Sequence, residues 1–197
     1  MSDNRRLAGF VSAMTRAVEQ DGDDEPTILQ KTEELLGDLL AVDDWLPAPC
    51  GEPNPDSYRQ YLLHCDPLER FSVVSFVWGP GQKTPVHDHQ TWGAIGVLRG
   101  AETEIPFTTS GGSITPGETH HLEPGDIGTV SPTIGDVHQV SNAYEDRTSI
   151  SIHVYGANIG RVRRHVFDPT SGDPSPFISS YSNDTVPNLW NTVNGVS

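Results

Sequence analysis

Between Tyr58 and Phe167 the sequence is a succession of short β-rich runs separated by turn residues, and this texture constrains the fold more than any other feature. The clearest runs span Phe71–Trp78, Trp92–Leu98 and Thr148–Tyr155. Clusters of glycine and proline, such as Gly79-Pro80-Gly81, lie between such runs. Many short strands with regular turn signals are typical of a sandwich or a barrel. The sequence therefore predicts a mainly β fold.

The chain before this region is expected to be helical. The apolar face of a first helix would be formed by Leu7, Phe10, Val11, Met14 and Val18. Pro26 suits the first turn of a second helix. That helix would bury Leu29, Leu35, Leu36, Leu39 and Leu40. Within a single domain we predict a helical extension over residues 1–57, a barrel over 58–168, and an extended tail over 169–197 that packs apolar side chains on the barrel.

The charge of the chain excludes some classes of partner. There are 27 acidic and 12 basic residues, for a formal net charge of −15. This charge repels phosphate backbones and anionic membrane surfaces, so we expect no nucleic-acid or membrane partner. Cys50 and Cys65 do not make a disulfide framework, the first six residues are polar, and no apolar run has the length of a membrane span. These features favour the cytoplasm.

Three histidines form a candidate metal site. His87 and His89 are separated by Asp88, and in a strand residues two apart point to the same side. Two imidazoles on one face are half of a transition-metal site. His138 begins a later β-like run and would supply a third ligand. The alternatives are a structural zinc pair or surface histidines. The adjacent pair His120-His121 would face opposite sides and is expected at the surface.

The spacing of these residues resembles the cupin superfamily. The residues that match its first motif are Gly81, His87, His89 and Gly100. Those that match the end of its second motif are Gly135, His138 and Asn142. The glutamate of the first motif falls on Gly93, so the usual carboxylate ligand is missing. The resemblance implies a cupin barrel, a double-stranded β-helix of the jelly-roll type, with the helices as an N-terminal extension.

The missing glutamate and a row of Ser151, His153 and Tyr155 make the chain resemble the thiol dioxygenases, which include cysteine dioxygenase and 3-mercaptopropionate dioxygenase. The resemblance implies Fe(II) held by the three histidines, with Tyr155 reaching the iron site. His153 would orient Tyr155, and Ser151 would orient His153. The row alternates with apolar residues, so in a barrel its polar face can point inward. Where cysteine dioxygenase carries a crosslinked cysteine this chain has Gly93, so no crosslink is expected.

The substrate clamp is also suggested by this resemblance. Gln60 falls where cysteine dioxygenase has the arginine that binds the substrate carboxylate. In this respect the chain resembles bacterial enzymes that prefer 3-mercaptopropionate and use an arginine beyond the tyrosine. Arg161, Arg163 and Arg164 lie there, and the spacing favours Arg164, whereas Arg161 and Arg163 are expected at the surface. An arginine can bind a carboxylate through two parallel hydrogen bonds.

These features together predict an enzyme that adds both atoms of O₂ to the sulfur of a small thiol carboxylate. The expected reaction converts 3-mercaptopropionate to 3-sulfinopropionate. The alternative substrate is L-cysteine, and other small thiols stay open. The alternative function is a metal-binding cupin without oxygenase activity, such as a sensor or an isomerase.

Overall fold

The computed structural model describes residues 4–110 and 112–190. The start of the polar N-terminal segment and the end of the predicted tail lie outside the described residues. The described chain begins with two helices, α1 (Arg5–Asp21) and α2 (Glu25–Leu40), followed by the short 3₁₀ helix η1 (Ala48–Gly51). Strands and loops follow. The predicted mainly β fold with an N-terminal helical extension is therefore confirmed.

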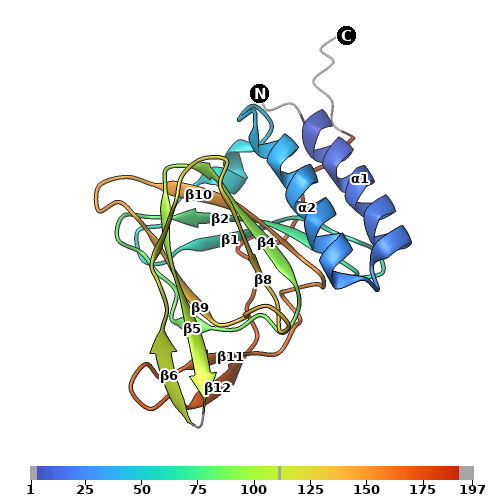
Figure 1. Cartoon of the computed structure of the whole chain (residues 1–197). Coiled ribbons are helices and arrows are strands. Elements are labelled where there is room, and N and C mark those ends of the chain that lie inside the picture. The colour runs from blue at the N-terminus through green and yellow to red at the C-terminus, as the bar shows by residue number, and fades with distance from the viewer. Residues whose placement is uncertain (1–3, 111, 191–197) are drawn as a thin grey trace.

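The strands form two antiparallel sheets that face each other across the barrel interior (Figure 1). The first sheet has the order β1 (Arg59–Cys65), β2 (Ser72–Trp78), β10 (Ser149–Tyr155), β4 (Gly93–Arg99) and β8 (Ile127–Val130). The second has the order β12 (Pro174–Phe177), β11 (Arg164–Phe167), β3 (Val86–His87), β9 (His138–Asn142), β5 (Glu102–Ser110) and β6 (Ser113–Pro116), and β7 (His120–Leu122) pairs with β5.

The two helices pack against the outer face of the first sheet (Figure 1). All five residues predicted for the apolar face of α1 are buried. In α2, Leu35 is only half-buried, and Ile28 and Thr32 complete the buried face. Gly96 of β4 allows the close approach of α2, because a side chain at this position would collide with Leu40. The helices thus give the first sheet a second apolar layer.

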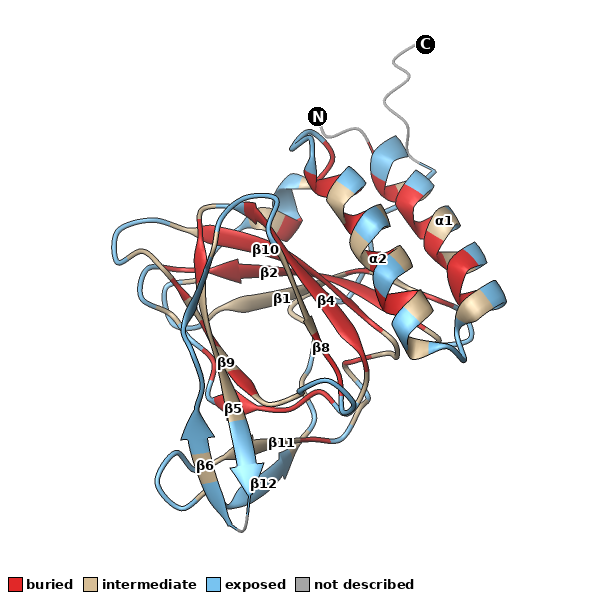
Figure 2. Cartoon of the chain, viewed as in Figure 1, coloured by how far each residue is buried: buried red, intermediate tan, exposed pale blue. Residues whose placement is uncertain are grey.

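This layer explains why the central strands are buried on both faces. Strands β2, β4 and β10 are almost wholly buried, whereas β6 and β12 are largely exposed (Figure 2). Ile150, Ile152 and Val154 of β10 belong to the apolar cluster that includes the helices. The alternate residues of the same strand therefore point into the barrel, as predicted, because successive side chains in a strand point to opposite faces.

The segment after the barrel returns to it as a further strand. β12 pairs with β11, and Tyr181 packs against the apolar cluster inside the barrel. Ser182 forms two hydrogen bonds with the backbone of Gln60 on β1. Trp190, by contrast, is 88% exposed and does not pack on the barrel as expected of the tail. The bounds of the extension, barrel and tail stay predictions.

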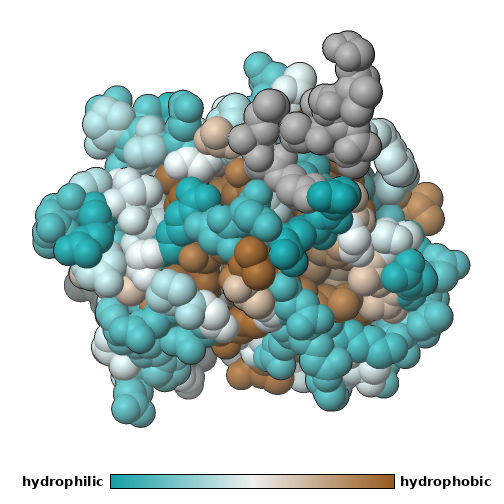
Figure 3. Space-filling model, turned by 90° about the horizontal axis from the view of Figure 1, so that it is seen from above, coloured by the Kyte–Doolittle hydropathy of each residue, from teal (hydrophilic) through white to brown (hydrophobic). Residues whose placement is uncertain are grey.

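The surface seen from above is mostly hydrophilic, with apolar side chains showing between the polar ones (Figure 3). The part of the chain that the structure describes contains no helix with the length and apolar character needed to cross a membrane.

Candidate metal centre

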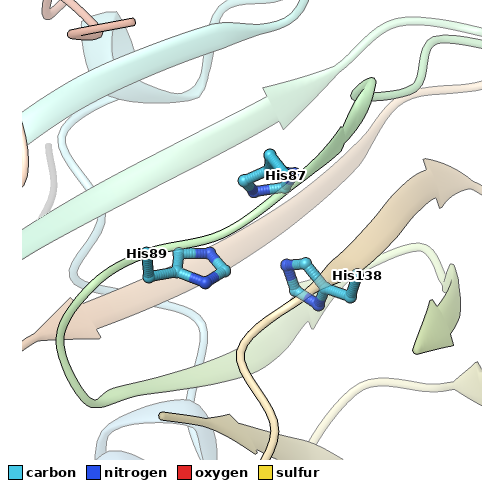
Figure 4. A group of neighbouring side chains, drawn as sticks. All are labelled: His87, His89 and His138. Atoms are coloured by element: carbon cyan, nitrogen blue, oxygen red, sulfur yellow. The ribbon is translucent and has the colours of Figure 1, made fainter. Parts of the chain in front are cut away.

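His87, His89 and His138 converge inside the barrel (Figure 4). One ligand nitrogen from each histidine lies within 4.8 Å of the others. The ring centroids of the three pairs are 4.8, 4.9 and 4.9 Å apart. β3 ends at His87, so His89 is not on a strand as expected, and Gln90 turns the chain with a φ of 58°. Across the sheet His87 pairs directly with His138, which brings the third ring to the first two.

Each of the two histidines from the first segment is oriented through its Nδ1 atom. Nδ1 of His87 lies 3.1 Å from the backbone oxygen of Pro85. Nδ1 of His89 lies 3.1 Å from Oδ1 of Asp136, which also accepts the backbone N–H of His89 at 3.0 Å. A partner that accepts the Nδ1 proton fixes the tautomer and leaves Nε2 as the nitrogen free to bind a metal.

The third histidine has the same arrangement. Nδ1 of His138 lies 2.6 Å from Oε1 of Glu104 on β5. The other Glu104 oxygen is 3.7 Å from Nδ1 of His120, which is exposed. His120 and His121 are both exposed, as predicted.

The donor set fits a divalent metal ion. Nε2 of His89 is buried and has no hydrogen-bond partner among the described residues. A metal ion bound at this nitrogen would satisfy it. Burial first, then the charge of neighbouring groups including Arg164, holds the pKa of His87 and of His89 well below the usual value. Both rings are therefore neutral at physiological pH, as metal ligation requires. His87, His89 and His138 are the residues that could hold the ion.

A buried acid ties this ligand segment to the strand that carries Arg164. Oδ1 of Asp88 accepts the backbone N–H of His165 at 2.6 Å, and Oδ2 lies 2.8 Å from Nδ1 of the same histidine. Oδ2 also accepts a hydrogen bond from Gln90 at 2.7 Å. Asp88 thus points away from the histidine cluster and fixes the position of β11 beside it.

The predicted row on β10 is a continuous chain of hydrogen bonds. Ser151 Oγ lies 2.8 Å from His153 Nε2, and His153 Nδ1 lies 2.8 Å from the hydroxyl of Tyr155. All three side chains are buried, and burial raises the pKa of Tyr155 while Arg164 opposes the rise. The Tyr155 ring lies 5.5 Å, centroid to centroid, from the ring of His89. The row therefore runs directly to the edge of the metal centre.

Arg164 is the buried member of the three arginines that follow the tyrosine. Its side chain is 3% exposed, whereas Arg161 and Arg163 are exposed and Arg161 forms an ion pair with Glu69. The Arg164 guanidinium lies over the ring of Phe177 at 4.7 Å and donates to Ser179 at 2.5 Å.

The guanidinium of Arg164 has unused binding capacity. Its Nε is buried without a hydrogen-bond partner. Burial lowers the pKa of Arg164, and the nearby hydroxyls of Tyr155 and Tyr58 partly restore it. The charge of Arg164 also contributes to the low pKa of His87 and His89. A buried cation with a free donor beside the metal centre can accept an anionic group.

Gln60 lies on the inner face of the first sheet. It pairs with Phe76 of β2, and Phe76 pairs in turn with Ser151 of β10. Directly paired residues present their side chains on the same face of a sheet. Gln60 therefore shares the face of the Ser151–His153–Tyr155 row, and the adjacent Arg59 lies on the opposite face.

Gly93 lies against the ring of Tyr155. A Cβ atom at Gly93 would be 2.9 Å from Cδ1 of Tyr155 and 3.1 Å from its Cε1. The residue beside this ring is thus a glycine and not a thiol. Cys50 is buried in the cluster under the helices, and Cys65 ends β1.

Glu104 and Asp136, which orient two of the ligands, and Asp88, which holds β11 beside them, are not predicted from the sequence. Asp136 and Asp88 are acids next to turns, and only the fold brings Asp136 to His89. Glu104 has a usable signal, because Glu102 and Glu104 are two apart in a β-like run and therefore share one face. Two carboxylates on one face of a barrel strand indicate an interior polar site.

The chain is similar to one protein family and to several solved structures. Residues 68–168 match the family model for cysteine dioxygenase type I, a segment that contains all three histidines, the row on β10 and Arg164. A protein with a double-stranded β-helix domain from Klebsiella pneumoniae is 18% identical, with a TM-score of 0.45 over 67% of this chain and 87% of that one. A cupin superfamily protein from Desulfitobacterium hafniense is 14% identical, with a TM-score of 0.44 over 59% and 94%.

Proposed function

This chain belongs to the cysteine dioxygenase type I family, and on that premise we propose that it is an Fe(II)-dependent thiol dioxygenase acting on a small thiol carboxylate. Both atoms of O₂ are added to the sulfur, and a thiol becomes a sulfinate. The four electrons lost by sulfur are those that O₂ accepts, so no other reductant is needed. The observation that carries the proposal is the set of three buried histidines without a carboxylate ligand, next to a buried tyrosine and a buried arginine.

The metal is assigned to His87, His89 and His138. When bound, Fe(II) would coordinate the thiolate and supply the reactivity toward O₂. Three neutral imidazoles leave the ion its full charge, which favours an anionic thiolate ligand. The role of Glu104 and Asp136 is to hold two of the rings in the orientation that the ion needs.

We assign Arg164 as the residue that binds the carboxylate of the substrate. The free Nε of this buried guanidinium supports the assignment, because a carboxylate is the ligand that would satisfy it. Gln60 on the inner face adds a neutral hydrogen-bonding group. The hydroxyl of Tyr155, held by His153, donates a hydrogen bond to the substrate or to oxygen. These contacts would position the thiol carboxylate among the buried side chains of the barrel interior.

We favour 3-mercaptopropionate over L-cysteine as the substrate. Cysteine carries an additional ammonium group, and a buried ammonium group requires an acidic partner. The two acids next to the ligand segment are already engaged, Asp88 with His165 and Asp136 with His89. In a thiol carboxylate without an amine, the carboxylate pairs with Arg164, and no ammonium group is left without an acidic partner.

The experiment is oxygen uptake by the iron-loaded protein with 3-mercaptopropionate and with L-cysteine, together with identification of the product by NMR. We expect stoichiometric sulfinate and a higher kcat/KM for 3-mercaptopropionate. A higher kcat/KM for cysteine would make cysteine the substrate. Zinc as the native metal, with no thiol-dependent oxygen uptake after iron loading, would contradict the proposal and favour a non-oxygenase cupin.

A further inference from the structure

A second buried glutamate lies beside the row on β10. Glu102 is the first residue of β5 and is fully buried. Both of its carboxylate oxygens are enclosed and have no hydrogen-bond partner within the described residues. Burying an ionised carboxylate without a partner costs free energy of folding. The presence of such a group in the folded protein therefore needs an explanation.

The polar side chains beside this carboxylate belong to the row. Ser151 and Trp78 are the two groups whose proximity favours its charged form. Trp78 Nε1 donates to Ser151 Oγ at 3.3 Å. Ser151 in turn contacts His153, and His153 contacts Tyr155. Glu102 thus lies at the inner end of a series of groups whose outer end is the active-site hydroxyl.

The protons of this series can take two arrangements. With Glu102 protonated, a turn of its carboxyl group toward Ser151 would let the hydroxyl donate to Ser151; Ser151 would then donate to Nε2 of His153, and Nδ1–H of His153 to the Tyr155 oxygen. The Tyr155 proton is then free to point into the site. With Glu102 ionised every donor reverses, and Tyr155 donates to Nδ1 of His153. A serine has a single proton, and a neutral histidine carries one ring proton, so both groups reverse together.

We propose that Glu102 is a positioning residue whose proton decides whether the Tyr155 hydroxyl donates a hydrogen bond into the active site. Loss of that proton to solvent moves the ring proton of His153 from Nδ1 to Nε2 and turns the Tyr155 O–H toward Nδ1 of His153, away from the active site. One proton leaves the protein, and no bond between heavy atoms changes. The effect on turnover rests on the proposed dioxygenase function, whereas the proton arrangement does not.

The electrostatic surroundings place this change near neutrality. Burial raises the pKa of Glu102 to about 8, Ser151 and Trp78 partly offset the rise, and Glu104 adds to it. The titratable groups near Glu102 are Glu104 on its own strand and His138 of β9, which lines the same narrow internal cavity. Burial first, and then the neighbouring histidines and Arg164, hold the pKa of His153 well below the usual value, so that ring stays neutral while Glu102 titrates.

The test combines infrared spectroscopy with pH profiles of the iron-loaded protein. We expect the wild type to show the carbonyl stretch of a protonated buried carboxyl group, lost as the pH rises through about 8 and absent from Glu102→Gln. The same pH range should bring a fall in kcat in the wild type. Glu102→Gln should lack this alkaline fall, because its amide donates to Ser151 at every pH. The matched control is Glu118→Gln at an exposed site, which should keep both the band and the fall.

Ser151→Ala separates the two ends of the chain. It should keep the carboxyl band and lose the alkaline fall in kcat. Absence of the band from the wild type below pH 8 would overturn the proposal, and this measurement needs no variant and no turnover. A band that titrates while Glu102→Gln keeps the alkaline fall would overturn the link to Tyr155. If iron-loaded protein consumes no oxygen, the function fails, and the infrared titration still decides the state of Glu102.

Discussion

Oε1 of Glu104 lies 2.6 Å from Nδ1 of His138, so that a carboxylate on β5 fixes a candidate metal ligand on β9. Burial acts to raise the pKa of Glu104, but the hydrogen bond and the charges of His138 and His120 lower it overall. The acid is therefore ionised at neutral pH and holds the Nδ1 proton of His138. Nε2 of His138 is directed toward the other two imidazoles as a consequence (Figure 4).

Replacing Glu104 by glutamine should weaken metal binding. The loss of the carboxylate that orients a ligand typically costs about 10–100-fold in metal affinity. The measurement is the dissociation constant for Fe(II) by chelator competition, with Glu118→Gln as the exposed control. Unchanged affinity in Glu104→Gln would mean that His138 does not need this partner, or does not bind the metal.

Arg164→Lys should impair use of the carboxylate substrate. Lysine keeps the charge and loses the planar fork, and we expect kcat/KM to fall by the equivalent of about 2 kcal/mol or more. Arg163→Lys, one residue away and exposed, is the matched control. For a small thiol without a carboxylate, both variants should change kcat/KM only slightly and to the same extent. If Arg164→Lys leaves kcat/KM for the carboxylate substrate unchanged, the clamp is a different residue.

Tyr155→Phe should lower turnover without loss of iron. The variant removes the hydroxyl 2.8 Å from His153 and leaves the three ligands intact. The removal of one preorganised donor of this kind costs roughly 100-fold in kcat. Metal analysis and steady-state kinetics are the two measurements. Loss of iron together with activity would instead place Tyr155 among the groups that hold the ion.

Gly93→Ala should disturb the site, although the change adds a single methyl group. The new Cβ would lie 2.9 Å from Cδ1 of Tyr155, so the ring has to move. Overpacking of this kind costs about 1–3 kcal/mol of stability, and the displaced hydroxyl should lower kcat. Gly9→Ala on the exposed face of α1 has no atom within 4 Å of the new Cβ and should stabilise the protein by roughly 0.5–1 kcal/mol. Thermal unfolding compares the two, and equal shifts would contradict the close contact at Tyr155.

The stability of the protein should depend on pH through Glu102. Its pKa is about 8 in the folded protein and roughly 4.3 when unfolded, so the folded state binds the extra proton. The stabilisation from that proton is complete below the unfolded pKa and is lost as the pH rises through the folded one. The melting temperature of the wild type relative to Glu102→Gln should therefore fall over this range. A constant difference would mean that Glu102 does not change its ionisation on folding.

The histidine pair and the row on β10 could be predicted because their chemistry is local in the chain. His87 and His89 are two apart, as are Ser151, His153 and Tyr155, and a period of two places side chains on one face wherever a strand forms. The strand in fact ends at His87, and His89 lies in the segment after it, where Asp136 contacts its backbone N–H and its Nδ1. The two rings converge as expected, but the two-residue period of a strand does not explain it, because His89 lies beyond the end of the strand.

The residues that give the site its electrostatics follow no local pattern. Glu104 reaches His138 because β5 pairs with β9, and Asp136 reaches His89 across a turn. Glu102 is two residues from Glu104 and lies on the same face of β5. Only the packing of the two sheets places it beside Ser151, with neither carboxylate oxygen in a hydrogen bond to the described residues.

The mainly β barrel, the helical extension and the candidate ligands were therefore predictable from the residue pattern and the motif spacing, because periodicity and turn chemistry act over a few residues. The folded protein was needed to show which nitrogen of each imidazole is free and which acid lies at the inner end of the row. Those properties depend on burial and on contacts between strands far apart in the chain, and desolvation is set by the whole fold rather than by any neighbour in sequence.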